Sequence, residues 1–321
     1  MDLLRRLLVA GVVVALVVLA FLVFRNRSPQ APMVGRIGYL NIAASLPLFI
    51  AEANGYFAEE GVQAETVEMA TSDQLVEGIV AGDLDVLIEA SAVPVLAAEL
   101  QSPGTLKVFS VSSITKEAPF DTVLVREDSA LANLQDLAGK TIGVFPGSTA
   151  TNLLKKFLDD SGIDTANITF VPIPPENQLT ALLEGSVDAV HAYEPTTAIA
   201  LSHEGVRDLY GSVYAAMLDR NPQGVAAVSA SFLEERPEAA TGVIRALERG
   251  MVFMREEEAE ARQILGSRLK LEPEVSNRSV FLYMLPHEQV DTAIFQKYAD
   301  MLIDVGELGG SVDMNTLLYR E

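Results

Sequence analysis

The sequence predicts an α/β fold made of two similar lobes, and three observations support this prediction. Short apolar and β-branched runs alternate with stretches of helical periodicity along most of the chain. One arrangement of strand, tight turn and helix occurs twice. The 321 residues are 49% hydrophobic, which is enough for a sizeable core in one large domain or two ordinary ones.

The repeated arrangement is clearest in its second copy. Residues 141–145 form a short apolar run that predicts a buried strand, and the Pro-Gly pair at 146–147 ends it. Ser148 and Thr149 are expected to cap the helix that follows, and Gly162 lies just past its predicted end. Free backbone N–H groups at the helix N-terminus then face the carboxyl end of the strand. No Lys follows the glycine at P-loop spacing, so this is not a phosphate-binding P-loop.

Glycines mark the ends of corresponding elements in the two copies. Six of them form three pairs, at separations of 104, 101 and 103 residues. A repeat of this length is much longer than that of a solenoid, and it predicts two α/β lobes, each built as strand, helix, strand, helix, strand. The paired glycines are Gly35 with Gly139, Gly61 with Gly162, and Gly82 with Gly185.

The other expected elements follow from the same signals. In the first copy, strands are expected at 36–40, 64–67, 85–89 and 107–111. A capping box formed by Thr71 and Gln74 is expected to open a helix. The helices expected elsewhere cover 48–54, 232–254 and 293–305.

Four loops at the carboxyl ends of predicted strands define the candidate site. Ligands of open α/β sheets bind at this end, and clefts between lobes commonly hold small molecules. The loops cover residues 40–47 and 89–94 in the first lobe and 145–149 and 192–196 in the second. The candidate ligand-binding residues in them are Asn41, Ser45, Glu89, Ser91, Ser148, Thr149, Tyr193 and Glu194.

The chemistry of these loops leaves two kinds of ligand open. None of the loops contains Lys, Arg or His, so an anion would rest on the backbone N–H groups and hydroxyls of Ser148 and Thr149 and on the helix dipole. If both are ionised, Glu89 and Glu194 would oppose an anion and favour an amine or a ring that carries OH or NH groups. The hypothesis we carry forward is a small organic solute with at least one hydrogen-bond donor.

Several candidates also have a structural interpretation. Tyr193 can belong to the core, and Asn41 and Ser91 are common turn formers. Glu89 can point to solvent, in which case it would not contact a ligand.

Composition excludes several other classes of function. Lys and Arg number 23 against 44 Asp and Glu, a net charge of −21, which disfavours binding to nucleic acid. The chain has no Cys, and therefore no disulfide, thiolate metal site or thiol nucleophile. Its three His residues are scattered without metal-ligand spacing. The sequence predicts neither a metal nor a cofactor.

The N-terminus carries a predicted membrane segment. Residues 7–24 contain no charge, and a helix of that length covers roughly 27 Å, close to the hydrocarbon thickness of a bilayer. Two arginines flank it on each side, so the flanking charges do not set its orientation. We expect residues 1–32 to be an uncleaved transmembrane helix and tether, with a cleaved signal peptide as the alternative.

Four segments, taken in order and spacing, resemble a known family. They are IGYLNIAASLPLFIAEANGYFAEEGV (37–62), SDQLVEGIVAGDLDV (72–86), LAGKTIGVFPGSTATNLLKKFL (137–158) and LLEGSVDAVHAYEP (182–195). With them, residues 36–315 resemble the substrate-binding proteins of ABC importers, in the group that includes nitrate, sulfonate, taurine and thiamine-pyrimidine binders.

This resemblance implies a two-lobed, periplasmic-binding-protein-like clamshell of type II. Lobe one would comprise residues 33–119 plus 225–321, and lobe two residues 120–224. Such proteins bind a small solute between the lobes on the extracytoplasmic side of the cell membrane and deliver it to an ABC permease and its ATPase. The resemblance also implies an inter-lobe position for Glu194, where a structural hydrogen bond near the hinge is the alternative to ligand contact.

The chain departs from the family by its apparent membrane anchor and its lack of cysteine, and two other functions stay open. A membrane-tethered sensor acting through a partner is one. An enzyme is the other, because some relatives of this fold make the thiamine pyrimidine with a cysteine-rich signature, His and iron. The absence of Cys argues against that activity, and we expect no enzyme.

Overall fold

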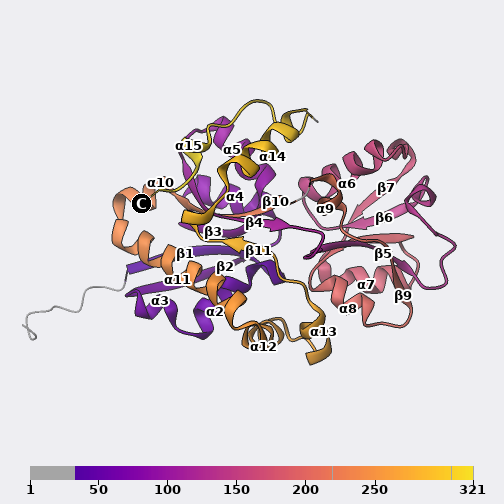
Figure 1. Cartoon of the computed structure of the whole chain (residues 1–321), viewed down its shortest axis with the longest axis horizontal. Helices are drawn as coiled ribbons and strands as arrows, with labels where there is room; N and C mark the ends of the chain where they lie inside the picture. The colour runs from indigo at the N-terminus through magenta and orange to yellow at the C-terminus, as the bar shows by residue number, and fades with distance from the viewer. Residues whose placement is uncertain (1–32, 219, 305, 321) are drawn as a thin grey trace, which may run out of the picture. The chain divides into compact units, whose positions relative to one another are not determined.

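The computed structural model describes residues 33–218, 220–304 and 306–320. From Val34 onward the chain forms one compact unit that contains two β-sheets (Figure 1). The predicted membrane anchor over residues 1–32 lies outside the described residues. Of the helices described, none combines the length and the hydropathy needed to span a bilayer.

The first sheet has six strands in the order β11-β4-β10-β3-β1-β2. Strand β3 runs parallel to β1 and antiparallel to β10, and β4 runs antiparallel to both β10 and β11. A strand from late in the chain, β10, is thus inserted beside one of the earliest. The strands are β1 (Met33–Leu40), β2 (Val62–Met69), β3 (Val86–Ser91), β4 (Leu106–Ile114), β10 (Asn221–Ser229) and β11 (Tyr283–Leu285).

Helices from both ends of the chain pack around the first sheet. The longest, α11, buries an apolar stripe and packs closely against α2. A Cβ added at Gly250 of α11 would lie 2.2 Å from the backbone oxygen of Pro47, so glycine permits this approach. The helices are α2 (Leu46–Ala53), α3 (Tyr56–Glu59), α4 (Ser72–Ala81), α5 (Ala92–Gln101), α10 (Ala230–Glu235), α11 (Pro237–Glu256), α12 (Glu258–Leu269), α14 (Thr292–Asp304) and α15 (Met314–Leu317), with 3₁₀ turns η1 (Ala43–Ser45) and η4 (His287–Gln289).

The second sheet has five strands in the order β7-β6-β8-β5-β9. Strand β6 is parallel to β7 and β8, and β5 is antiparallel to β8 and β9. The strands are β5 (Asp121–Arg126), β6 (Thr141–Val144), β7 (Thr169–Pro172), β8 (Ala189–Tyr193) and β9 (Val206–Tyr210). The helices are α6 (Ser148–Asp160), α7 (Pro175–Leu183), α8 (Thr196–Leu201) and α9 (Val213–Met217), with α13 (Pro273–Arg278) against α8 and 3₁₀ turns η2 (Leu134–Leu137) and η3 (Thr165–Asn167).

The repeat predicted from the glycines is visible in the strand order. The sequence β2-β1-β3-β10 in one sheet corresponds to β7-β6-β8-β5 in the other, with three strands from a repeat followed by an antiparallel one. Equivalent hydrogen bonds accompany it. Asp85 accepts from the backbone N–H of Arg36, and Asp188 accepts from that of Thr141, both at 2.8 Å.

Two local predictions were wrong. The helix expected over 232–254 is two helices that meet at Arg236, because the residue before Pro237 is disfavoured in the helical region; its φ is −139° and its ψ 58°. Ser148 and Thr149 do not cap α6, whose N-cap is Gly147 with a φ of +116°. The expected capping at Thr71 is confirmed, since its side chain accepts from Gln74 N–H.

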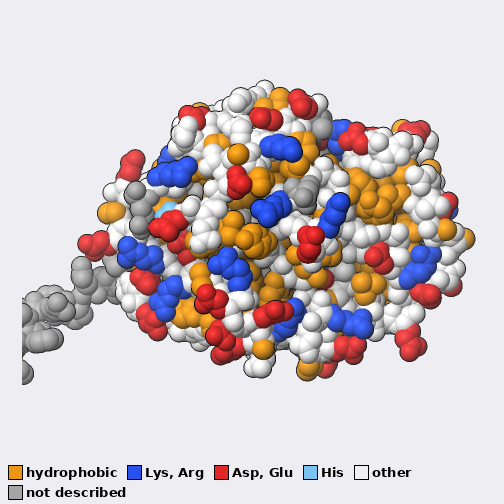
Figure 2. All heavy atoms as spheres, viewed as in Figure 1, with side chains coloured by type: hydrophobic (Ala, Val, Ile, Leu, Met, Phe, Trp, Pro, Cys, Tyr) orange, Lys and Arg blue, Asp and Glu red, His pale blue; other side chains and the backbone are white. Residues whose placement is uncertain are grey.

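Surface charge agrees with the composition. On the face drawn in Figure 2, acidic and basic side chains of the described residues are interspersed rather than gathered into a basic patch. This face therefore offers no continuous basic surface of the kind that nucleic-acid binding needs.

Candidate solute-binding site

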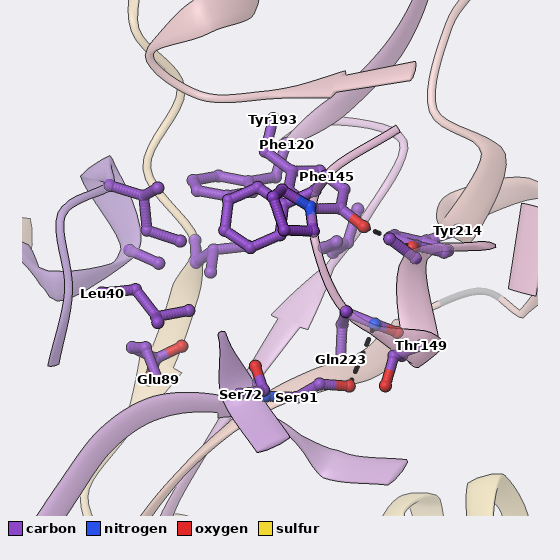
Figure 3. A pocket seen from close by; sticks show the side chains of 18 of the residues that line it. Leu40, Ser72, Glu89, Ser91, Phe120, Phe145, Thr149, Tyr193, Tyr214 and Gln223 are labelled. Carbon is purple, nitrogen blue, oxygen red and sulfur yellow. Dashed lines mark hydrogen bonds between the residues drawn. The ribbon is translucent and has the colours of Figure 1, made fainter. Parts of the chain in front are cut away.

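A cavity lies between the strand ends of the two sheets (Figure 3). The first sheet contributes Leu40 at the end of β1 and Ser91 at the end of β3, and the second contributes Phe145 after β6 and Tyr193 at the end of β8. The space within its walls measures about 620 Å³, its mouth included. The centre of a water-sized sphere can occupy only about 80 Å³ of it, so the cavity is small beside small-molecule sites, which are commonly 300–1,000 Å³.

Aromatic rings form one wall of the cavity. Tyr193 lies 5.4 Å from Phe145, 6.5 Å from Phe120 and 6.0 Å from Tyr214, measured between ring centroids. The hydroxyls of Tyr193 and Tyr214 share a hydrogen bond of 2.6 Å. Burial raises the pKa of Tyr193 well above its usual range, so both phenols stay uncharged. The wall is therefore neutral and suits a flat apolar body.

A buried polar pair holds this wall from behind. His191 and Asp121, both without solvent exposure, form a hydrogen bond of 2.8 Å between Nε2 and Oδ2. The same carboxylate accepts from Val213 N–H at 2.8 Å and from the Ser212 hydroxyl. The His191 ring meets both Tyr193 and Tyr214 edge-on, so this histidine supports the wall and does not enter the cavity.

Opposite the aromatic wall lies the carboxyl of Glu89, which is 4% exposed. The pairing of β3 with β10 shifts register here: Val225 faces Ala90, whereas Ala227 faces Leu87. The extra residue on β3 is a bulge, and Glu89 within it has a φ of +57°. Such a backbone conformation is uncommon for a side-chain-bearing residue, and the bulge redirects its side chain.

The environment of this carboxyl is apolar. The Ser112 hydroxyl donates to its Oε2 at 2.6 Å, while Oε1 is buried without a hydrogen-bond partner. Burial raises the pKa of Glu89 to about 8 although the Ser112 hydrogen bond lowers it. A Cβ at Gly224 would lie 2.4 Å from Glu89 Oε2, so the glycine leaves room for the carboxyl.

The N-terminus of α6 already faces a carboxylate of the first sheet's helices. Asp73, in the first turn of α4, lies 3.4 Å from Ser148 N and 3.3 Å from Ser148 Oγ. The sequence left open that an anionic ligand, if one binds, would rest at this helix end. In the structure Asp73 takes that position, which also makes it a second acidic residue in the cavity wall.

Four of the eight predicted site residues line the cavity and four do not. Glu89, Ser91, Thr149 and Tyr193 line it. The other four lie outside the lining: Asn41 is exposed in a turn, Ser45 is buried and donates to Leu40 O, exposed Ser148 contacts Asp73, and Glu194 is buried.

Glu194 has an environment of its own. Burial raises the pKa of its carboxyl to about 8, while backbone N–H groups of Val280 and Ala198 lower it. Its backbone oxygen accepts from Ala43 N–H at 3.4 Å. At pH 7 without a ligand, Glu89 and Glu194 are therefore mostly protonated. They do not oppose an anion as two ionised glutamates would.

Sequence reasoning missed several lining residues, among them Phe120, Tyr214, Gln223 and Gly224. None of these residues lies in a loop that follows a predicted strand of the two repeats. Phe120 and Gln223 lie where the chain passes from one sheet to the other, beside the predicted lobe boundaries at 119/120 and 224/225. Those boundaries were the available signal, because a segment that crosses between two lobes must pass the cleft.

The fold is that of periplasmic solute-binding proteins. The chain superposes on the structure of the alkanesulfonate-binding protein SsuA from Xanthomonas axonopodis pv. citri bound to MOPS with a TM-score of 0.74 and 24% identity, covering 91% of this chain and 100% of that one. The desulfurization enzyme DSZB is also similar in fold, with a TM-score of 0.65 at 16% identity over 89% of this chain and 97% of its own.

Sequence comparison confirms the resemblance and defines the family. Residues 43–261 match the model described as NMT1/THI5 like, and the chain belongs to this family. It is 27% identical over 234 residues to a protein of Bacillus subtilis (strain 168) named for binding aliphatic sulfonates, covering 71% of this chain and 68% of the relative. A protein of the same name from Escherichia coli (strain K12) is 27% identical over 191 residues, 59% of this chain and little more than half, 57%, of the relative.

Proposed function

We propose that this protein is an extracytoplasmic solute-binding protein that captures a small organic solute between two lobes and delivers it to an ABC import permease and its ATPase. Lobe one would comprise residues 33–119 plus 225–321 and lobe two residues 120–224. The observation that carries the proposal is the cavity, which has one wall from each sheet and lies at the carboxyl ends of their strands. The family of the chain and the printed names of its relatives support a binding role.

Within the cavity, four predicted residues are proposed to contact the solute. Tyr193 offers its ring, Ser91 and Thr149 offer hydroxyls, and Glu89 offers its carboxyl. Gln223 joins them, since its amide lies 3.5 Å from Ser91 Oγ and accepts from Tyr298 at 3.1 Å. The other four, Asn41, Ser45, Ser148 and Glu194, are proposed to hold the surrounding loops in place.

The wall chemistry favours an organic solute over an oxyanion. None of the described residues that line the cavity is Lys, Arg or His. Asp73 places a carboxyl group there, whereas that of Glu89, whose pKa burial raises to about 8, is mostly protonated at pH 7. An oxyanion would meet Asp73 where it needs backbone N–H groups. The relatives are named for sulfonates, so this chain would differ from them in ligand.

Binding, and not catalysis, is proposed although DSZB shares the fold. The chain has no Cys, the residue that the resemblance implied for the pyrimidine-synthesising branch. The N-terminal 32 residues are proposed to hold the lobes at the outer side of the cell membrane.

A thermal-shift screen of the full chain in mild detergent tests this function. The probes are nitrate, taurine, alkyl sulfonates, pyrimidines, riboflavin-like rings and small amines. A ligand of the folded state raises the melting temperature in a concentration-dependent way. No shift with any of them would contradict the proposal.

Two variants then test the site with the compound that binds. Ser91→Ala or Thr149→Ala should weaken binding by about fivefold to tenfold, the value of one hydrogen bond. The matched control is Thr151→Ala, on the same helix but outside the lining. Unchanged affinity in both Ser91→Ala and Thr149→Ala would overturn the site assignment.

A further inference from the structure

The carboxyl of Glu89 has features that solute binding in general does not require. It is held by a bulged strand with φ at +57°, which costs free energy that a glycine or a regular strand would avoid. It is almost fully buried, and its Oε1 has no hydrogen-bond partner. A buried carboxyl oxygen without a hydrogen-bond partner is unfavourable whether or not it carries a proton, so a ligand group that pairs with it would gain free energy on binding.

The surroundings of Glu89 decide which ligand group fits. Its own oxygen Oε2 already accepts from Ser112, and the neighbouring β10 presents Gly224, which has no side chain. The other titratable groups in the cavity wall are Asp73 from α4, Tyr193 from β8 and Tyr214 from α9, none of which can carry a positive charge. A positively charged partner for the Glu89 carboxylate therefore has to come from the ligand.

The aromatic wall points to the same ligand class. The faces and edges of Phe120, Phe145 and Tyr193 can enclose an apolar body, and aromatic faces attract cations through their quadrupole. Figure 3 places these rings across the cavity from Glu89 and Leu40. A ligand with an apolar ring at one end and a positive nitrogen at the other matches both walls.

We propose that the cavity binds a small organic ammonium ion, with an apolar or aromatic body, whose N–H group donates to Glu89 Oε1. This inference rests on the proposed function and names its ligand class. The ligand would lie with its body against the aromatic wall and its nitrogen at the bulge of β3.

Proton balance gives the proposal a distinct signature. Burial raises the pKa of Glu89 to about 8, so in the empty protein at pH 7 the carboxyl holds a proton. An ammonium ion arrives charged, the carboxyl loses its proton to solvent, and an N–H···O⁻ hydrogen bond forms. Binding thus releases one proton, and affinity rises by about tenfold per pH unit up to the pKa of Glu89.

The test uses three probes that share a phenyl ring and differ in their polar group: benzylammonium, benzyl alcohol and benzenesulfonate. Titration calorimetry on the full chain in mild detergent, between pH 6 and pH 8, measures each affinity. Repeating it in buffers of different ionisation enthalpy measures proton release. We expect benzylammonium to bind at least about tenfold more tightly than the other two at pH 8, with release of close to one proton at pH 7.

Glu89→Gln sharpens the test because glutamine keeps the volume and can still accept from Ser112. It should weaken benzylammonium binding by at least about tenfold and abolish its proton release. The matched control is Glu99→Gln: Glu99 is also 4% exposed with a raised pKa, but it accepts from Gly104 N–H and lies outside the cavity lining. Proton release from the unmodified chain keeps the test decisive even where the variant does not fold.

The outcomes separate this inference from the proposed function. Tighter binding of benzenesulfonate or benzyl alcohol, or binding of benzylammonium without proton release, overturns the ammonium inference and leaves solute binding intact. The same holds if all three fail while another compound of the thermal-shift screen binds. Failure of every compound in both experiments overturns the two proposals together.

Discussion

The two sheets share one plan and differ where their strands end. In each, a repeat supplies three neighbouring strands and an aspartate that accepts from the backbone N–H of the adjoining strand, Asp85 in the first and Asp188 in the second. At the cavity, however, β3 of the first sheet presents a carboxyl, whereas β8 of the second presents the ring of Tyr193. The repeat fixes the scaffold, while the loops at its strand ends differ enough to form two unlike walls around one ligand.

The equivalent aspartates give the strongest test of how far the repeat extends. Asp85 also pairs with Arg236 at 2.7 Å and with Arg36 at 3.0 Å, whereas Asp188 accepts from the backbone N–H of Thr141. Asp85→Ala should lower the free energy of unfolding by about 2–3 kcal/mol, because it removes the acceptor of the Arg36 backbone N–H and of two partly exposed guanidinium groups, which keep Gly82 O and Val34 O as partners. Asp188→Ala should cost about 1–2 kcal/mol. Urea denaturation measures both.

The control for this pair is Asp128→Ala, whose side chain is 85% exposed and which should change stability by less than about 0.5 kcal/mol. Equal losses for Asp85→Ala and Asp188→Ala would mean that the arginine pairs contribute nothing.

Gly224→Ala tests only the part of the cavity wall that is formed by Glu89. The new Cβ would lie 2.3 Å from Ser112 Oγ and 2.4 Å from Glu89 Oε2, so the hydrogen-bonded pair has to move. We expect a loss of about 1–3 kcal/mol in stability together with loss of ligand affinity. Gly211→Ala is the control, since no atom lies within 4 Å of its Cβ position. Wild-type stability and affinity in Gly224→Ala would show that Glu89 has room to move.

The pH dependence of the free energy of unfolding compares the two lobes, because each contains a buried glutamate. Burial raises the pKa of Glu89 and of Glu194 from 4.5 to about 8 in the folded state. The folded state therefore holds more protons than the unfolded state between these values, and stability falls as pH rises through this window. Each group contributes up to about 1.4 kcal/mol per pH unit.

Glu89→Gln and Glu194→Gln should each flatten this slope, and the double variant should flatten it further. Denaturation at pH 5, 6, 7 and 8 measures it. A slope that neither substitution changes would mean that other groups control the pH dependence.

The smallest expected effect concerns the contact between the lobes. Asp73 of α4 interacts with Ser148 and the N-terminus of α6, and such charge–dipole contacts contribute about 0.3–1 kcal/mol when exposed. A double-mutant cycle of Asp73→Asn and Ser148→Ala should give a coupling free energy in this range. Strict additivity would show that the contact, at 3.3–3.4 Å, has no energetic weight.

The sequence predicted the scaffold better than the site, for a physical reason. Strands such as β6 and the turn at Gly147 follow from neighbouring residues alone, so local patterns find them. The burial of Glu89 depends on a register shift against β10, a strand more than a hundred residues away. The position of Asp73 opposite Ser148 likewise depends on how two distant helices meet, so local patterns did not show that the N-terminus of α6, where an anion had been left open, faces a carboxylate.

The strand-end loops therefore contain Glu89, Ser91, Thr149 and Tyr193, which line the cavity, but not the crossing segments. A local sequence pattern does not show which cavity a connecting segment will lie beside in the folded protein. The residues around Phe120 and Gln223 resemble other loop and strand positions, and only their place beside the predicted lobe boundaries sets them apart.

These two crossing residues also have a mechanical consequence. Phe120 immediately precedes the first strand of the second sheet, and Gln223 lies in the strand that returns the chain to the first. A solute bound in the cavity would contact the two segments that connect the sheets and would restrict their movement. We expect the protein with a solute in this cavity to bend less readily between its two sheets than the protein without one.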